Sequence, residues 1–213
     1  MTYKTTFGSF RLLLGIALLG SVVWQITDRI ANNLFRPLEY FTYLSIDSAI
    51  YAGVVLLISG ALLLNHKRET VRLNVIRLGA TVAMIVIGAG YHLFLGDESG
   101  SPLDLGYDWP VLPNLIIHTY GPILVTLDYL FSVKGPKPSL SKAPWLLVFP
   151  LIWITYSIIR GSIDDVWPYW FLNPEEVGVG GVAIYIIGFT IFGLGLGFTL
   201  LVLRRLMQKI TGH

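Results

Sequence analysis

The chain has 213 residues, of which 54% are hydrophobic and only 13% are charged, and its mean hydropathy is +0.67. Soluble domains carry roughly a quarter of charged residues, so this composition excludes an ordinary soluble protein and indicates a polytopic membrane protein. The chain contains no cysteine, which excludes disulfides, thiolate catalysis and cysteine-based zinc or iron–sulfur sites.

Six apolar runs follow one another along the chain, separated by loops that hold most of the charged residues. We expect helices, because a backbone in lipid must satisfy its own hydrogen bonds and because the runs do not alternate as barrel strands do. A crossing helix needs about 20 residues, and the fifth run is short by this measure. The sequence therefore predicts one all-α domain, residues 1–213, with six transmembrane helices in a single bundle. The predicted spans are Phe10–Ile26, Tyr40–Leu64, Ile76–Leu95, Pro113–Phe131, Trp145–Ile159 and Gly181–Leu203.

The basic residues lie mostly on one side of these six spans, where the acidic residues are scarce. This side holds 12 of the 15 basic residues: Lys4, Arg11, Lys67, Arg68, Arg72, Arg77, Lys134, Lys137, Lys142, Arg204, Arg205 and Lys209. The other side holds Arg29, Arg36 and Arg160, together with the acidic Asp28, Glu39, Asp97, Glu98, Asp104, Asp108, Asp164, Asp165, Glu175 and Glu176. The positive-inside rule then places both termini in the cytoplasm.

With this orientation, several spans bring polar residues to one layer near the outer face. Thr42 and Ser45 begin the second span, and Asn114 and His118 begin the fourth, where a spacing of four residues puts them on one helix face. His92 and Arg160 end the third and fifth spans at the same face. At 1.5 Å per residue, Asp47 lies about 7 Å deeper than Thr42, and Asp128 lies about 15 Å further in than His118.

An ionisable residue inside a membrane is costly and is by default a functional candidate. His118 is therefore the first candidate for chemistry, whereas a threonine or serine at this depth is also common between packed helices. Asp47 is a candidate partner in a polar network. Arg160 either caps the fifth helix or binds a carboxylate.

Three stretches of the sequence resemble a bacterial family of six-span integral membrane proteins. They are YFTYLS at Tyr40–Ser45, NLIIHTYGPILVTLDYLF at Asn114–Phe131 and YSIIRGSIDDVWPYWFLNP at Tyr156–Pro174. That family is distantly related to the animal androgen-induced and androgen-dependent transmembrane proteins. These animal proteins are threonine hydrolases that cleave fatty-acid esters of hydroxy fatty acids. The resemblance implies a bacterial inner-membrane protein with its site near the outer face.

Carried over to this chain, the resemblance implies Thr42 as nucleophile and His118, in HTYGP, as general base. Ser45 remains a rival nucleophile, because an alignment anchored on Asp47 favours it over Thr42. A threonine hydroxyl needs a base to take its proton, and a neutral imidazole suits that task. Asn114, Tyr120 and Arg160 are alternative donors to the oxyanion that such a reaction forms.

We expect a metal-independent lipid esterase without a cofactor, whose partners are the membrane and an ester of long acyl chains. Without a basic cluster interleaved with aromatic residues in a soluble segment, nucleic acid is not an expected partner. Three alternatives stay open. One is a proton-coupled transporter or channel that uses His92, His118, Asp47 and Asp128 as a relay. The second is a zinc site of His92, His118 and Asp47, and the third is a lipid-binding protein without catalysis.

Overall fold

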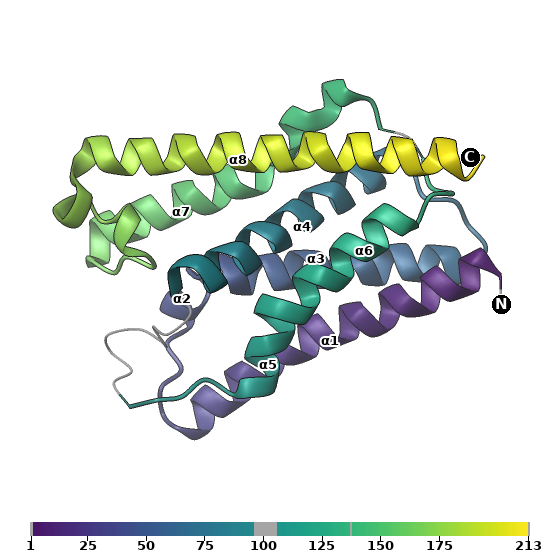
Figure 1. Cartoon of the computed structure of the whole chain (residues 1–213). Helices are drawn as coiled ribbons and strands as arrows, with labels where there is room; N and C mark the ends of the chain where they lie inside the picture. The colour runs from purple at the N-terminus through teal and green to yellow at the C-terminus, as the bar shows by residue number, and fades with distance from the viewer. Residues whose placement is uncertain (1, 96–105, 137, 213) are drawn as a thin grey trace.

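The computed structural model describes residues 2–95, 106–136 and 138–212, and all regular secondary structure in these ranges is helical. Figure 1 shows long helices running along one common direction, with the N and C termini at the same end of the molecule. Four of the charged residues counted above, Asp97, Glu98, Asp104 and Lys137, lie outside the described residues.

Each predicted run overlaps a long helix, in the predicted order, but most of these helices begin and end at other residues than predicted. The long helices are α1 (Tyr3–Ala31), α3 (Leu44–Leu64), α4 (Val71–Gly90), α6 (Gly121–Phe131), α7 (Val148–Asp164) and α8 (Pro174–Ile210). The short helices are α2 (Pro37–Tyr40) and α5 (Val111–Leu115), the π-helical turns η1 (Tyr91–Leu95) and η3 (Ile116–Tyr120), and the 3-10 segments η4 (Leu140–Leu147) and η5 (Trp170–Leu172).

The observed helix ends differ from the predicted ones because polar residues can begin or continue a helix when they are hydrogen bonded. The first predicted span, Phe10–Ile26, is a helix from Tyr3 to Ala31. It starts early because the side chain of Thr2 caps it by accepting a hydrogen bond from the backbone nitrogen of Thr5 at 3.3 Å. Near Gly178, α8 bends, since this glycine has φ 71°, which other residues rarely adopt.

Five helical segments are long and apolar enough to cross a membrane: Tyr3–Ala31, Leu44–Leu64, Val71–Leu93, Leu140–Asp164 and Pro174–Ile210. The chain is therefore a helical integral membrane protein. The predicted fourth span is helical throughout Val111–Phe131, as α5, η3 and α6, but it is not among these five. Its α6 part packs on α4 and α1 inside the bundle.

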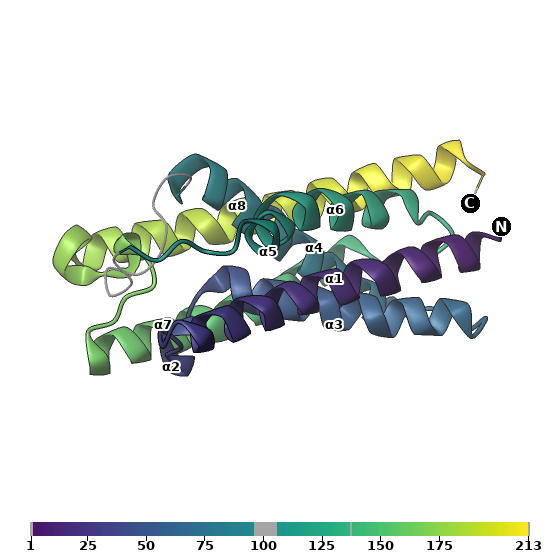
Figure 2. The ribbon, with the colours of Figure 1, turned by 90° about the horizontal axis from the view of Figure 1, so that it is seen from below.

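Helices α1 and α3 lie alongside one another (Figures 1 and 2) and pack through glycines. A Cβ atom added to Gly15 would lie 2.9 Å from the backbone oxygen of Gly53, and one added to Gly60 would lie 2.8 Å from that of Gly8. Real Cβ atoms do not come so close, so the two backbones meet where side chains would keep them apart.

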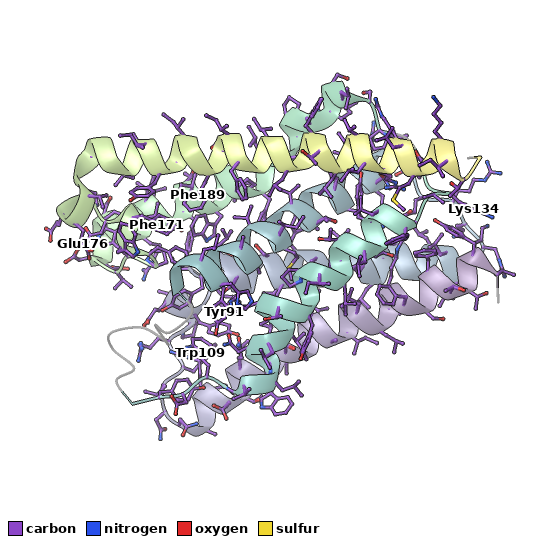
Figure 3. All side chains as sticks on the ribbon, viewed as in Figure 1. Tyr91, Trp109, Lys134, Phe171, Glu176 and Phe189 are labelled. Carbon is purple, nitrogen blue, oxygen red and sulfur yellow. The ribbon has the colours of Figure 1, made fainter. Side chains whose placement is uncertain are left out.

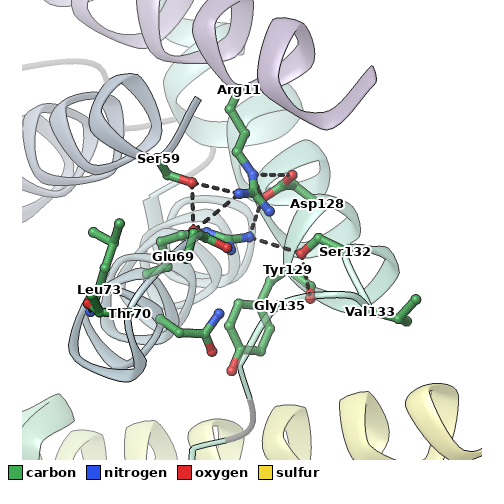
Figure 4. A network of polar contacts seen from close by, with 12 residues as sticks. Arg11, Ser59, Glu69, Thr70, Leu73, Asp128, Tyr129, Ser132, Val133 and Gly135 are labelled. Carbon is green, nitrogen blue, oxygen red and sulfur yellow. Dashed lines mark hydrogen bonds and ion pairs between the residues drawn. The ribbon is translucent and has the colours of Figure 1, made fainter. Parts of the chain in front are cut away.

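Four buried charged residues form an ion-pair square inside the bundle (Figure 4). Arg11 of α1 and Arg77 of α4 each contact both Glu69, which precedes α4, and Asp128 of α6. The distances are 3.2 and 2.8 Å from Arg11 and 2.9 and 2.5 Å from Arg77. All four side chains are at most 2% exposed.

This square corrects the sequence interpretation of several residues. Arg11 and Arg77 belong to the basic side of the predicted topology, and the structure places both inside helices, where they are buried. Arg204, from the same side, is likewise buried, in α8. The transporter alternative uses Asp128 in a proton relay, but both carboxylate oxygens of Asp128 accept hydrogen bonds from arginines. A hydropathy pattern cannot reveal such pairs, because a buried arginine is tolerable only when distant residues supply its partners.

Candidate functional site

A cavity of about 930 Å³ lies between several helices of the bundle. Four sequence candidates line it: Thr42, Ser45, Asn114 and His118. Most of its other walls are apolar or aromatic. Figure 3 labels four of the aromatic lining residues, Tyr91, Trp109, Phe171 and Phe189, and the acidic Glu176. Its size falls within the range of about 300–1,000 Å³ that ligand pockets occupy.

Thr42 lies in the turn between α2 and α3, which three hydrogen bonds fix in place. Its hydroxyl donates to the backbone oxygen of Leu38 at 2.6 Å, and its own backbone oxygen accepts from the indole Nε1 of Trp153 at 2.9 Å. Tyr156 also donates to Leu38, at 3.4 Å. Because Trp153 and Tyr156 belong to α7, that helix fixes the position of a residue more than a hundred positions earlier in the chain.

His118 lies in the π-helical turn η3, and the following proline explains this irregular turn. In an α-helix the backbone oxygen of His118 would accept a hydrogen bond from residue 122, but Pro122 has no N–H and its ring crowds that oxygen. The helix therefore widens locally, as helices often do at functional sites. Helix α4 comes close here, since a Cβ on Gly88 would lie 3.2 Å from the same oxygen.

The imidazole of His118 is oriented by two neighbours. Its Nδ1 lies 3.1 Å from the backbone oxygen of Asn114, which only accepts hydrogen bonds, so Nδ1 carries the proton. In the neutral ring Nε2 is then the basic nitrogen. Tyr91 stacks on the imidazole, with centroids 4.3 Å apart, and its hydroxyl accepts from Nδ2 of Asn114 at 2.9 Å.

Thr42 and His118 line the same cavity but are not hydrogen bonded to each other, although both lie in the described part of the chain. A proton transfer from Thr42 to His118 would require this hydroxyl to rotate away from the backbone oxygen of Leu38 and to reach Nε2 directly or through a water molecule. Ser45 also lines the cavity, and its hydroxyl makes no hydrogen bond with any described residue. The hydroxyl of Ser45 is thus free of hydrogen bonds to described residues, whereas that of Thr42 is bonded to Leu38.

The structure places the remaining supporting candidates, Asp47, His92, Tyr120 and Arg160, outside the described lining of the cavity. His92 pairs through Nε2 with the hydroxyl of Thr119 at 3.0 Å, and Tyr120 is 50% exposed. Arg160 forms an ion pair with Asp164 one turn later on α7.

The charged side chains in the described lining of the cavity are all acidic. Its described lining contains four carboxylates and neither lysine nor arginine. The carboxylates belong to Glu39, Asp108, Asp165 and Glu176.

Sequence reasoning missed Tyr91 and Trp153, which orient the two central residues. Each is an aromatic residue within an apolar run, and such residues are ordinary in membrane helices. The sequence gives no signal that separates them from lipid-facing aromatics. Within the described residues, no three histidine, aspartate or glutamate side chains gather as a metal site would require. His92, His118 and Asp47 accordingly do not form one.

In comparisons with known proteins, the chain matches no protein-family description, no curated protein and no solved structure.

Proposed function

We propose that this protein is a membrane-embedded hydrolase of lipid esters, with Thr42 as nucleophile and His118 as general base. The observation that carries the proposal is the single cavity whose lining includes both residues. Its apolar walls suit long acyl chains, and the resemblance of the three sequence stretches described above points to the same chemistry. Fatty-acid esters of hydroxy fatty acids, or similar lipids, are the proposed substrates.

In the proposed reaction, Nε2 of His118 takes the hydroxyl proton of Thr42 while Oγ1 attacks the ester carbon. The tetrahedral intermediate then collapses, and His118 gives the proton to the departing alkoxide. A water molecule, activated by the same Nε2, hydrolyses the acyl-threonine and releases the fatty acid. Asn114 is the proposed oxyanion donor, because its amide lies on the cavity and has a second N–H beyond the one given to Tyr91.

We further propose six crossings with both termini in the cytoplasm of a bacterial cell, which puts the cavity near the outer face of the inner membrane. Two observations support an even number of crossings. The helical run from Val111 to Phe131 is of crossing length, and the two termini lie at the same end of the bundle (Figure 1). The loop charges supply the direction.

Hydrolysis of long-chain esters of hydroxy fatty acids by purified protein in nanodiscs tests the proposal. We expect turnover by the wild type and a loss of at least about a hundredfold in Thr42→Ala and His118→Ala, as removal of a general base alone costs. Thr126→Ala is a matched control, because Thr126 also donates to a backbone oxygen but lies outside the described cavity lining. Wild-type rates in both Thr42→Ala and His118→Ala would rule the proposal out.

A further inference from the structure

A third buried arginine lies beside the ion-pair square without a carboxylate of its own. The square is neutral, because its two arginines face two carboxylates. Arg204 of α8 is 2% exposed and donates to the side-chain oxygen of Asn74 at 2.9 Å and to the backbone oxygen of Ser132 at 3.0 Å. Both partners are uncharged, so Arg204 adds one positive charge that no described carboxylate contacts.

A buried positive charge without a negative partner destabilises the folded protein. A guanidinium does not give up its proton in proteins, so Arg204 cannot become neutral as a buried lysine can. Removing an ion from water costs several kcal/mol when no opposite charge is near. The only described carboxylates nearby, those of the square, already pair with other arginines.

Three buried hydrogen-bond donors around this guanidinium have no partner among the described residues. They are Nε of Arg204, Nδ2 of Asn74 and the hydroxyl of Tyr129. The guanidinium lies over the Tyr129 ring, 4.6 Å from its centroid, and it is bonded to the side chain of Asn74. The donors come from α8, α4 and α6, and all three residues are at most 2% exposed.

We infer that Arg204, Asn74 and Tyr129 hold a small anion between α4, α6 and α8. One negative charge would balance Arg204, and its lone pairs would accept hydrogen bonds from the three donors. The chemistry fits either a free monovalent ion such as chloride or a phosphate oxygen of a lipid headgroup. The burial of all three residues favours an enclosed free ion.

The inference is separate from the proposed hydrolysis. Lys134, in the loop that follows α6 near Ser132, lies at the end of the molecule with the termini, whereas Glu176 of the cavity lies toward the other end (Figure 3). An anion here would tie three helices together rather than meet the substrate.

Thermal unfolding in a detergent free of phospholipid tests the inference, with chloride exchanged for gluconate at constant ionic strength. We expect the Tm of the wild type to rise with chloride and to saturate, and ³⁶Cl⁻ to bind at one site per chain. Tyr129→Phe removes one donor without removing the charge and should need at least about tenfold more chloride, because hydrogen bonds to charged groups contribute about 1.5–3 kcal/mol. Arg204→Gln should abolish both the rise and the binding.

Arg205→Gln is the matched control. Arg205 is the next residue of α8 and donates to the backbone oxygen of Pro138, so its loss should leave the chloride response unchanged. A second arm uses nanodiscs of phosphatidylglycerol. Stabilisation by this lipid, abolished in Arg204→Gln and without a chloride response, would assign the anion to a headgroup. Absence of both responses, or an equal effect of Arg205→Gln, would overturn the inference.

Discussion

Replacement of Asp128 by asparagine should destabilise the protein more than most single substitutions. The carboxylate of Asp128 accepts hydrogen bonds from Nε of Arg11, at 2.8 and 3.0 Å, and from Nη2 of Arg77 at 2.5 Å. Asparagine keeps the shape but carries no charge, and it turns an amide N–H₂ toward an arginine. Two buried arginines would then share the single carboxylate of Glu69.

Breaking a buried pair by removing one partner costs about 3–5 kcal/mol. For a chain of this length, each kcal/mol lowers Tm by about 2–4 °C, so Asp128→Asn should lower Tm by roughly 6–20 °C. Thermal unfolding followed by circular dichroism in one nanodisc composition measures the shift. Asp108→Asn, at an exposed carboxylate, is the control and should change Tm little.

The double variant Asp128→Leu with Arg77→Met separates lost charge from lost shape. It keeps the contact of Arg11 with Glu69 and leaves no unpaired charge in the square, so it should be more stable than Asp128→Asn. A Tm for Asp128→Asn within about 2 °C of the wild type would refute the idea that these charges are enclosed.

Three other predictions concern stability. Burial alone would raise the pKa of Glu69, but the charges of Arg77 and Arg11 outweigh it and hold the pKa below the ordinary 4.5. The stability that ionised Glu69 contributes is therefore fully present above about pH 4.5 and is lost as the pH falls through the lower pKa of the folded state. In Glu69→Gln, the curve of stability against pH should lack this loss, and a curve with the same loss as the wild type would contradict the prediction. Gly15→Ala should lower the free energy of unfolding by about 1–3 kcal/mol, because the new Cβ would meet the α3 backbone. The control Gly20→Ala, on the same helix, meets nothing and should be neutral or slightly stabilising. Equal denaturation midpoints of the two variants would argue against close packing of α1 on α3. Trp153→Phe removes the donor to Thr42 and should cost about 0.5–1.5 kcal/mol in thermal unfolding, and no loss would mean that the bond is unimportant.

The helices could be predicted because lipid imposes one backbone solution on any long apolar run. Hydropathy therefore located the helical runs, and the spacing of Asn114 and His118 brings the His118 ring to the backbone oxygen of Asn114, which accepts a hydrogen bond from Nδ1. The expectation that Thr42 shares a layer with His118 agrees with their common cavity. The catalytic roles of these residues stay predictions.

The remaining features depend on contacts between distant residues. Arg11 and Asp128 are 117 positions apart, and nothing local distinguishes a paired arginine inside the bundle from a loop arginine. Arg160 looked available to a substrate, yet Asp164 one helical turn later pairs with it. The π-helical turn at His118 fits the missing N–H of Pro122, and the sequence does not show that α4 packs closely there, where a Cβ on Gly88 would lie 2.9 Å from the Pro122 ring.

Labelling of the nucleophile tests the central claim most directly. A long-chain alkyl fluorophosphonate reacts with an activated hydroxyl, and peptide mass spectrometry then locates the adduct. The account predicts one adduct, on Thr42, in the wild type and none in His118→Ala. An adduct on Ser45, or labelling of Thr42 that persists without His118, would contradict it.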